Sequence, residues 1–199
     1  MDRDFQRFYL NAFPQYLEED VLAVLNYLQS YSTKFHSKHT YQVFVKQDVI
    51  HLPVRTYFKL PNNPQFSNFP IIQQKILCCI YTRHHDGFIR QTMLERLLSC
   101  PLDDFIIPYV FQLLGEYVQE ILLSIEPFIN VENQTHLAEF ILENPKYFRT
   151  TESRIVSYWN EYYRHKQNKY FKDYIGAKIL EKLRSLVRNY HSSSQKRSI

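Results

Sequence analysis

Two histidines and an aspartate stand together in Arg83-His84-His85-Asp86, the densest cluster of potentially reactive side chains in this chain. Imidazole and carboxylate groups are zinc ligands and also serve as acids and bases in catalysis. Adjacent side chains point away from each other, however, and zinc sites on helices use ligands three or four residues apart. We therefore expect no metal site and no cofactor.

Two other groups could supply enzymatic chemistry. Cys78 or Cys79 could act as a nucleophile with His84, but both cysteines fall on an apolar helix face without a basic neighbour to lower the thiol pKa. Glu116 and Glu120 stand four residues apart and could act as paired carboxylates, but we expect a solvated face or pairing with Arg83, Arg90 or Arg96 instead. We predict no catalytic residue. A hydrolase built on turn 83–86 is a further hypothesis, which ranks below the two binding functions given at the end of this subsection.

Basic and aromatic residues alternate near the C-terminus, as on surfaces that track phosphates and stack on bases. Residues 161–199 hold ten Lys and Arg against three Asp and Glu. The candidate nucleic-acid contacts are Arg164, Lys166, Lys169 and Lys172. A solvated helix, or pairing with acids of the same chain, is the alternative explanation of this charge.

The middle of the chain has the opposite character, because no Lys or Arg occurs between Arg96 and Lys146 while eight acids do. This segregation of charge, together with 16 tyrosines, favours recognition of another protein. The candidate contacts are Asp103, Asp104, Glu116, Glu120, Trp159, Tyr162 and Tyr163. The acidic and basic parts could instead face each other.

Glycine is scarce, with three residues in 199, which disfavours folds that need tight turns or phosphate-binding loops. Apolar residues recur mostly at helical spacing, and only the region near 41–57 alternates as a strand pair does. We predict a mostly α-helical fold, one domain over residues 1–190, with a small hairpin near 41–57. Its parts are N-terminal helices over 1–30, a linker over 59–70, a helical core over 71–190 and a disordered tail over 191–199.

Residues 71–98 read as two apolar helices joined by a turn that carries Asp86-Gly87-Phe88-Ile89-Arg90. This turn resembles that of a HEAT-type helical repeat. The resemblance implies that Asp86 caps the second helix and that Arg90 pairs with acids or carbonyls of adjacent repeats. Arg83 belongs to the same structural turn, and Gly87 suits a turn that needs a positive φ. The resemblance concerns architecture and implies no activity.

The chain has no apolar run near the roughly 20 residues that span a bilayer. Its three cysteines, Cys78, Cys79 and Cys100, show no metal-binding spacing and read as reduced thiols, so we expect a cytoplasmic protein without membrane contact. The favoured function is non-catalytic binding of another protein, as an adaptor or a toxin-neutralising binder. The alternative is a nucleic-acid-binding accessory protein, and the oligomeric state stays open.

Overall fold

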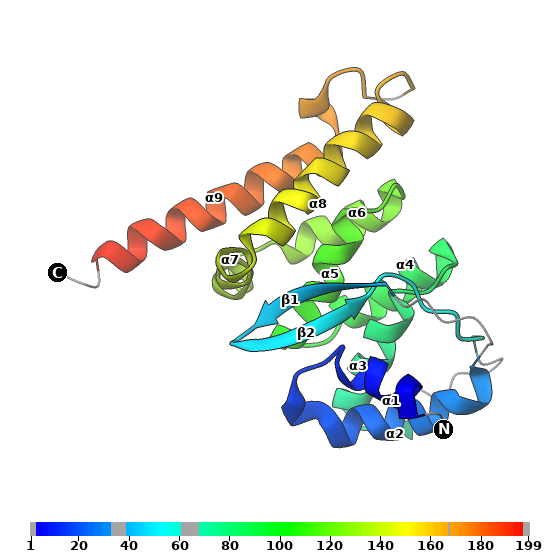
Figure 1. Cartoon of the computed structure of the whole chain (residues 1–199). Coiled ribbons are helices and arrows are strands. Elements are labelled where there is room, and N and C mark those ends of the chain that lie inside the picture. Colours follow the sequence, from blue (N-terminus) through cyan, green and yellow to red (C-terminus); the bar gives the residue numbers. More distant parts are fainter. Residues whose placement is uncertain (1–2, 33–38, 61–67, 167, 197–199) are drawn as a thin grey trace. The chain divides into compact units, whose positions relative to one another are not determined.

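The computed structural model describes residues 3–32, 39–60, 68–166 and 168–196 (Figure 1). It confirms a mostly α-helical fold with a two-stranded antiparallel hairpin within these ranges. The chain groups into two compact units, Met1–Tyr109 and Val110–Ile199, which are described separately below as unit 1 and unit 2. The assignment of residues 1–190 to a single domain stays a prediction.

Unit 1 combines four α-helices with the hairpin in the described residues. Its elements are α1 (Arg3–Leu10), η1 (Gln15–Leu17), α2 (Glu18–Leu28), η2 (Gln29–Tyr31), β1 (Thr40–Val45), β2 (Asp48–Pro53), α3 (Ile71–Tyr81), α4 (Gly87–Leu98) and η4 (Asp104–Ile106). Helix α2 begins with three acids, where the helix dipole favours negative charge, and its apolar face is fully buried. Neighbouring helices along the chain pack against each other, α1 on α2, α2 on α3 and α3 on α4.

The hairpin lies within the predicted region near 41–57, and its second strand ends at Pro53. Val43 pairs with Ile50, and both are fully buried, whereas the neighbouring pair Phe44 and Val49 is exposed. The predicted alternation of buried and exposed side chains is therefore confirmed. Lys46 and Gln47 form the two-residue turn with φ of 47° and 78°, the positive values that a type I′ hairpin requires.

Helix α5 (Ile107–Leu114) starts in unit 1 and continues into unit 2. The other elements of unit 2 are α6 (Gln119–Ile125), η5 (Glu126–Phe128), α7 (Gln134–Glu143), α8 (Pro145–Tyr158), a π-helical turn η6 (Trp159–Tyr163), η7 (Phe171–Asp173) and α9 (Ile175–Lys196). Helix α9 packs along α7, α8 and α6 through Ile179, Leu180 and Leu183, all of which are buried.

Two predicted segments lie partly outside the described residues. Within the predicted linker 59–70, residues 61–67 are not described, and within the predicted tail 191–199, residues 197–199 are not described. Helix α9 continues to Lys196 and so includes most of the segment that we predicted to be a disordered tail.

Candidate functional site

The turn between α3 and α4 is built around two buried arginines. The guanidinium of Arg83, which is fully buried, donates to the carbonyls of Pro53 (3.1 Å), Thr82 (3.2 Å) and Val54 (2.9 Å). Arg90 is also buried and donates from Nη1 to the carbonyls of His84 and His85, both at 2.9 Å. The hydrogen bonds of Arg83 connect the turn to the end of β2 and to Val54, which follows it. Those of Arg90 stay within the turn. Both arginines have a structural role here.

Asp86 caps α4, as the HEAT-like resemblance implied. Its side chain accepts a hydrogen bond from the Phe88 backbone N–H at 2.8 Å. Arg90 donates to carbonyls of its own turn. Membership of the HEAT-type family stays a prediction.

The prediction of a positive φ for Gly87 is wrong. Gly87 is the first residue of α4, and the described glycines have no positive φ. The chain reverses before this residue, and Asp86 enters the helix with an extended backbone (φ −79°, ψ 127°). A valine at position 87 would therefore meet no strain of the kind that a positive φ imposes.

His84 is buried and held in one neutral tautomer. The backbone N–H of Asp86 donates to Nδ1 (3.0 Å), so the ring proton lies on Nε2 and is donated to the Phe58 carbonyl (2.8 Å). Burial lowers the pKa of His84, since desolvation disfavours the charged ring. Both ring nitrogens are used within the fold, so His84 is not placed to serve as a base for a substrate.

The stability of the protein should fall in mild acid because of His84. The unfolded chain takes up a proton near the ordinary histidine pKa of about 6.5, whereas folded His84 resists protonation until a lower pH. The free energy of unfolding should therefore drop below about pH 6.5, by up to about 1.4 kcal/mol per pH unit, until the folded pKa is passed. Urea titrations between pH 7.5 and 5 should show a smaller drop for His84→Gln. An equal drop in both proteins would contradict this role of His84.

The cysteines of α3 are not nucleophiles in this fold. Cys78 and Cys79 are buried and free. Burial raises the pKa of Cys78 to about 12 and raises that of Cys79 well above its ordinary value. The thiolate needed for attack is therefore scarce at neutral pH.

Asp103 and Asp104 form ion pairs inside unit 1. The ammonium of Lys75, whose side chain is 6% exposed, donates to Asp103 (2.6 Å) and to the Pro101 carbonyl (2.7 Å). Asp104 pairs with Lys46 in the hairpin turn, where the lysine side chain is 63% exposed. Both acids, predicted as partner contacts, thus hold unit 1 together.

These two ion pairs should differ in their contribution to stability. Asp103→Asn leaves the ammonium of Lys75 buried without a counter-charge, so we expect a loss of about 2 kcal/mol. Asp104→Asn removes a pair whose lysine is hydrated, so we expect a loss below about 1 kcal/mol. Urea unfolding of both variants measures the difference. Equal losses would show that the burial of Lys75 has no energetic consequence.

Several acids of unit 2 are buried or contact other residues of the same unit. Glu116 is 3% exposed and lies in the break between α5 and α6, whereas Glu120 is exposed in the first turn of α6. The two glutamates are thus not on one helix and do not form the carboxylate pair considered above. Further along the chain, acids contact α9: Glu126 pairs with Lys182, Glu152 with Arg184 (2.8 Å), and Glu139 accepts from the Tyr190 hydroxyl (3.0 Å).

Three tyrosines from two separate segments form an exposed cluster in unit 2. Tyr162 lies with its ring centroid 5.5 Å from that of Tyr117 and 6.0 Å from that of Tyr158, and Tyr117 and Tyr158 are 6.2 Å apart. Tyr117 and Tyr162 remain 47% and 41% exposed. Tyr117 was not among the predicted contacts, since it is far from 158–162 in the sequence.

The π-helical turn Trp159–Tyr163 positions this cluster. Trp159 donates from Nε1 to the Asn168 carbonyl (2.8 Å) and packs edge-on against Phe171, so it folds the following loop back onto the turn. Tyr163 donates its hydroxyl to the Tyr117 carbonyl and stacks on Tyr174 at 5.1 Å. Trp159 and Tyr163 thus support the surface, and π-helical turns of this kind are frequent at functional sites.

The loop that follows carries exposed basic residues. Arg164 lies over the Trp159 ring at 5.7 Å. Lys169 and Lys172 lie over the ring of Tyr170, at 5.7 and 5.8 Å from its centroid, and Tyr170 is 57% exposed. Lys166 is exposed in the same loop. We call the exposed side chains of residues 158–166 and 168–172, together with Tyr117, the 158–172 surface; Figure 1 shows this segment between α8 and α9.

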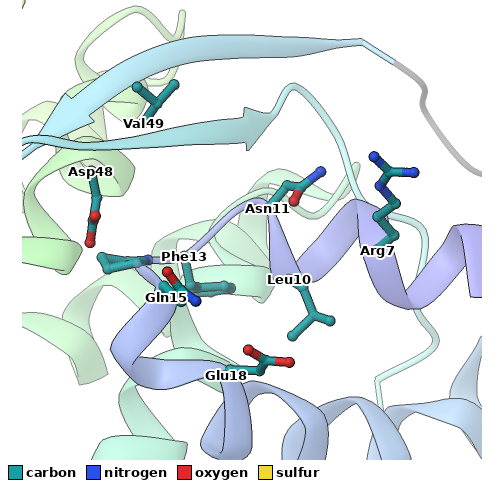
Figure 2. Close-up of a pocket in the computed structure, with 9 residues that line it drawn as sticks. Arg7, Leu10, Asn11, Phe13, Gln15, Glu18, Asp48 and Val49 are labelled. Carbon is teal, nitrogen blue, oxygen red and sulfur yellow. The ribbon is translucent and has the colours of Figure 1, made fainter.

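A groove of about 390 Å³ in unit 1 lies beside α1, η1 and the hairpin turn (Figure 2). Its wall mixes apolar side chains, such as Leu10 and Val49, with charges of both signs, such as Arg7 and Glu18. This mixture selects no single ligand chemistry, and we assign no function to the groove.

Residues 3–32, 39–60, 68–166 and 168–196 contain neither a candidate metal site nor a helix that could span a membrane. No group of three or more His, Cys, Asp or Glu side chains is arranged to hold a metal ion. No helix in these ranges is both long enough and apolar enough to cross a membrane.

Comparison with protein-family models, with characterised proteins and with solved structures found no match for this chain.

Proposed function

We propose that this chain is a non-catalytic protein-binding module and that its contact is the 158–172 surface. The carrying observation is the exposed cluster of Tyr117, Tyr158 and Tyr162, held by a π-helical turn. Tyrosine supplies a large contact area with few rotatable bonds and a hydroxyl for hydrogen bonding, which suits protein interfaces.

The contacts of three acidic residues that were predicted to bind a partner favour the 158–172 surface as the binding site. Asp103 and Asp104 pair with lysines of unit 1, and Glu116 is buried, so these carboxylates already have partners or lie away from solvent. The exposed tyrosines of the 158–172 surface are the better candidates for contact with another protein.

The test is recovery of a partner from the native source by the purified, tagged chain, compared between matched tyrosine variants. Tyr162→Ala removes the member of the cluster whose ring lies nearest to both others, and Tyr16→Ala removes a tyrosine that is 70% exposed in unit 1. We expect Tyr162→Ala to reduce recovery of a stoichiometric protein partner at least about tenfold, as loss of a hot-spot residue does. Tyr16→Ala should have no effect.

The assay should run at low and moderate salt, with and without nuclease. Recovery that survives both treatments and depends on Tyr162 would support protein binding. Recovery that disappears with nuclease, or that is equal for both tyrosine variants, would overturn the proposal, and in the first case would favour nucleic acid.

A further inference from the structure

Two groups of basic residues in unit 2 have different surroundings. On α9, Lys182 and Arg184 are neutralised by Glu126 and Glu152 of the same unit. In the loop before α9, Lys166, Lys169 and Lys172 are exposed and form no ion pair with any residue that the structure describes. The positive charge of the loop is therefore available to a partner.

The lysines of the loop lie beside aromatic rings rather than apart from them. Lys169 and Lys172 both lie over Tyr170, and the tyrosine cluster begins a few residues before them. A ligand bound to this surface therefore contacts ammonium groups and aromatic rings at the same time. Negative charge combined with apolar side chains matches that pattern, and both occur in acidic protein segments.

The ring geometry favours a protein ligand over a nucleic acid. Bases stack on open ring faces, but Lys169 and Lys172 both lie over the ring of Tyr170. The rings of Tyr117, Tyr158 and Tyr162 are inclined to one another at interplanar angles of 32° to 59°. Rings inclined in this way do not form a row of parallel faces on which successive bases could stack.

We infer that the 158–172 surface binds an acidic segment of a partner protein. Carboxylates of the segment pair with Lys166, Lys169 and Lys172, and its apolar side chains pack on the tyrosine cluster. This inference rests on the proposed function and adds the chemistry of the partner to it.

The test uses three fluorescent probes of equal length against the full chain. They are the peptide (Asp-Glu-Phe)5, its uncharged counterpart (Asn-Gln-Phe)5 and the oligonucleotide dT15, and binding is measured by fluorescence anisotropy. We expect saturable binding of the acidic peptide that is at least tenfold tighter than binding of the other two. Equal binding of both peptides, or tighter binding of dT15, would overturn the inference.

Charge reversal locates the contact on the surface. Lys169→Glu should weaken binding of (Asp-Glu-Phe)5 at least fivefold, and Lys169→Glu combined with Lys172→Glu at least twentyfold. Arg188→Glu is the matched control, because Arg188 is an exposed base of α9 outside the loop. Equal weakening by the control would mean that net charge alone attracts the peptide, which contradicts a site.

Failure of the inference can be told apart from failure of the proposed function. If (Asp-Glu-Phe)5 does not bind but a partner is still recovered in a Tyr162-dependent manner, the function stands and the partner is not acidic. If neither occurs, both proposals fail. Circular dichroism of each variant confirms that the helical fold is retained.

Discussion

Replacing Arg83 with methionine should lower the free energy of unfolding by about 3 kcal/mol. Methionine keeps a long apolar chain in the buried space but donates no hydrogen bond, so the carbonyl of Pro53 loses the donor that Arg83 provides, while that of Val54 retains a bond from Arg55. Each buried carbonyl left without a partner costs about 1–3 kcal/mol. Urea unfolding, followed by circular dichroism, measures the loss.

Two further variants separate hydrogen bonding from charge at this position. Arg83→Lys keeps the charge but replaces the planar guanidinium with one ammonium, which cannot reach three carbonyls in different directions, so we expect an intermediate loss. Arg55→Met removes another donor to the Val54 carbonyl at a site that water can reach, and should cost less than about 1 kcal/mol. If Arg83→Met were no more harmful than Arg55→Met, the buried hydrogen bonds would not stabilise the turn.

The helix pair around this turn could be predicted because its signals are local. Apolar residues at helical spacing define α3 and α4, and Asp86 is a residue type that caps helices. The role of Arg83 could not be predicted, because its acceptors lie 29 and 30 residues earlier in the chain. A charged side chain in a polar turn is normally exposed to solvent, whereas Arg83 is fully buried and contacts the segment after β2.

Helix boundaries in unit 2 illustrate how one residue can have two meanings. The residue types of Thr150-Thr151-Glu152 predict the start of a helix, but α8 begins at Pro145. Proline ends a preceding helix and also fits the first position of a following one, where its missing N–H is not needed. The sequence from Asp103 or Asp104 to about Ile125 likewise predicts one continuous helix, whereas the structure has an interruption between α5 and α6 that begins at Gly115. The side chain of Arg154 lies close to Gly115 but is remote from it in sequence, so this contact could not be predicted.

Only the part of the candidate surface that is continuous in sequence could be predicted. The alternation of basic and aromatic residues in 158–172 is visible in the sequence, and the exposed loop carries it. Tyr117 lies in the cluster although it is remote in sequence, and the hydroxyl of Tyr163 donates to its carbonyl across 46 residues. The acidic residues are a second case: composition left open whether they face a partner or basic residues of the same chain, and their pairing with Lys75, Lys46 and α9 could not be read from spacing.

Gly176→Ala should be the most damaging small substitution in unit 2, with a loss of about 2–3 kcal/mol. The added Cβ would lie 2.5 Å from Cε1 of Tyr174 and 2.6 Å from Cγ2 of Ile155, and both side chains are buried. Neither can move away freely, so α9 must shift from α8, and overpacking of this kind costs about 1–3 kcal/mol. For a chain of this length the melting temperature should fall by about 5 °C or more.

Gly115→Ala is the matched control within the same unit. Its Cβ would lie 3.0 Å from Cδ of Arg154, a flexible side chain that can turn aside, so we expect a loss below about 1 kcal/mol. Because Tyr174 stacks on Tyr163 of the π-helical turn, a displaced Tyr174 should also disturb the 158–172 surface. Gly176→Ala should therefore weaken binding of the acidic peptide at a temperature where the variant is still folded, whereas Gly115→Ala should not. Equal melting temperatures for the two variants would show that the start of α9 has room for a side chain, contrary to the close packing described above.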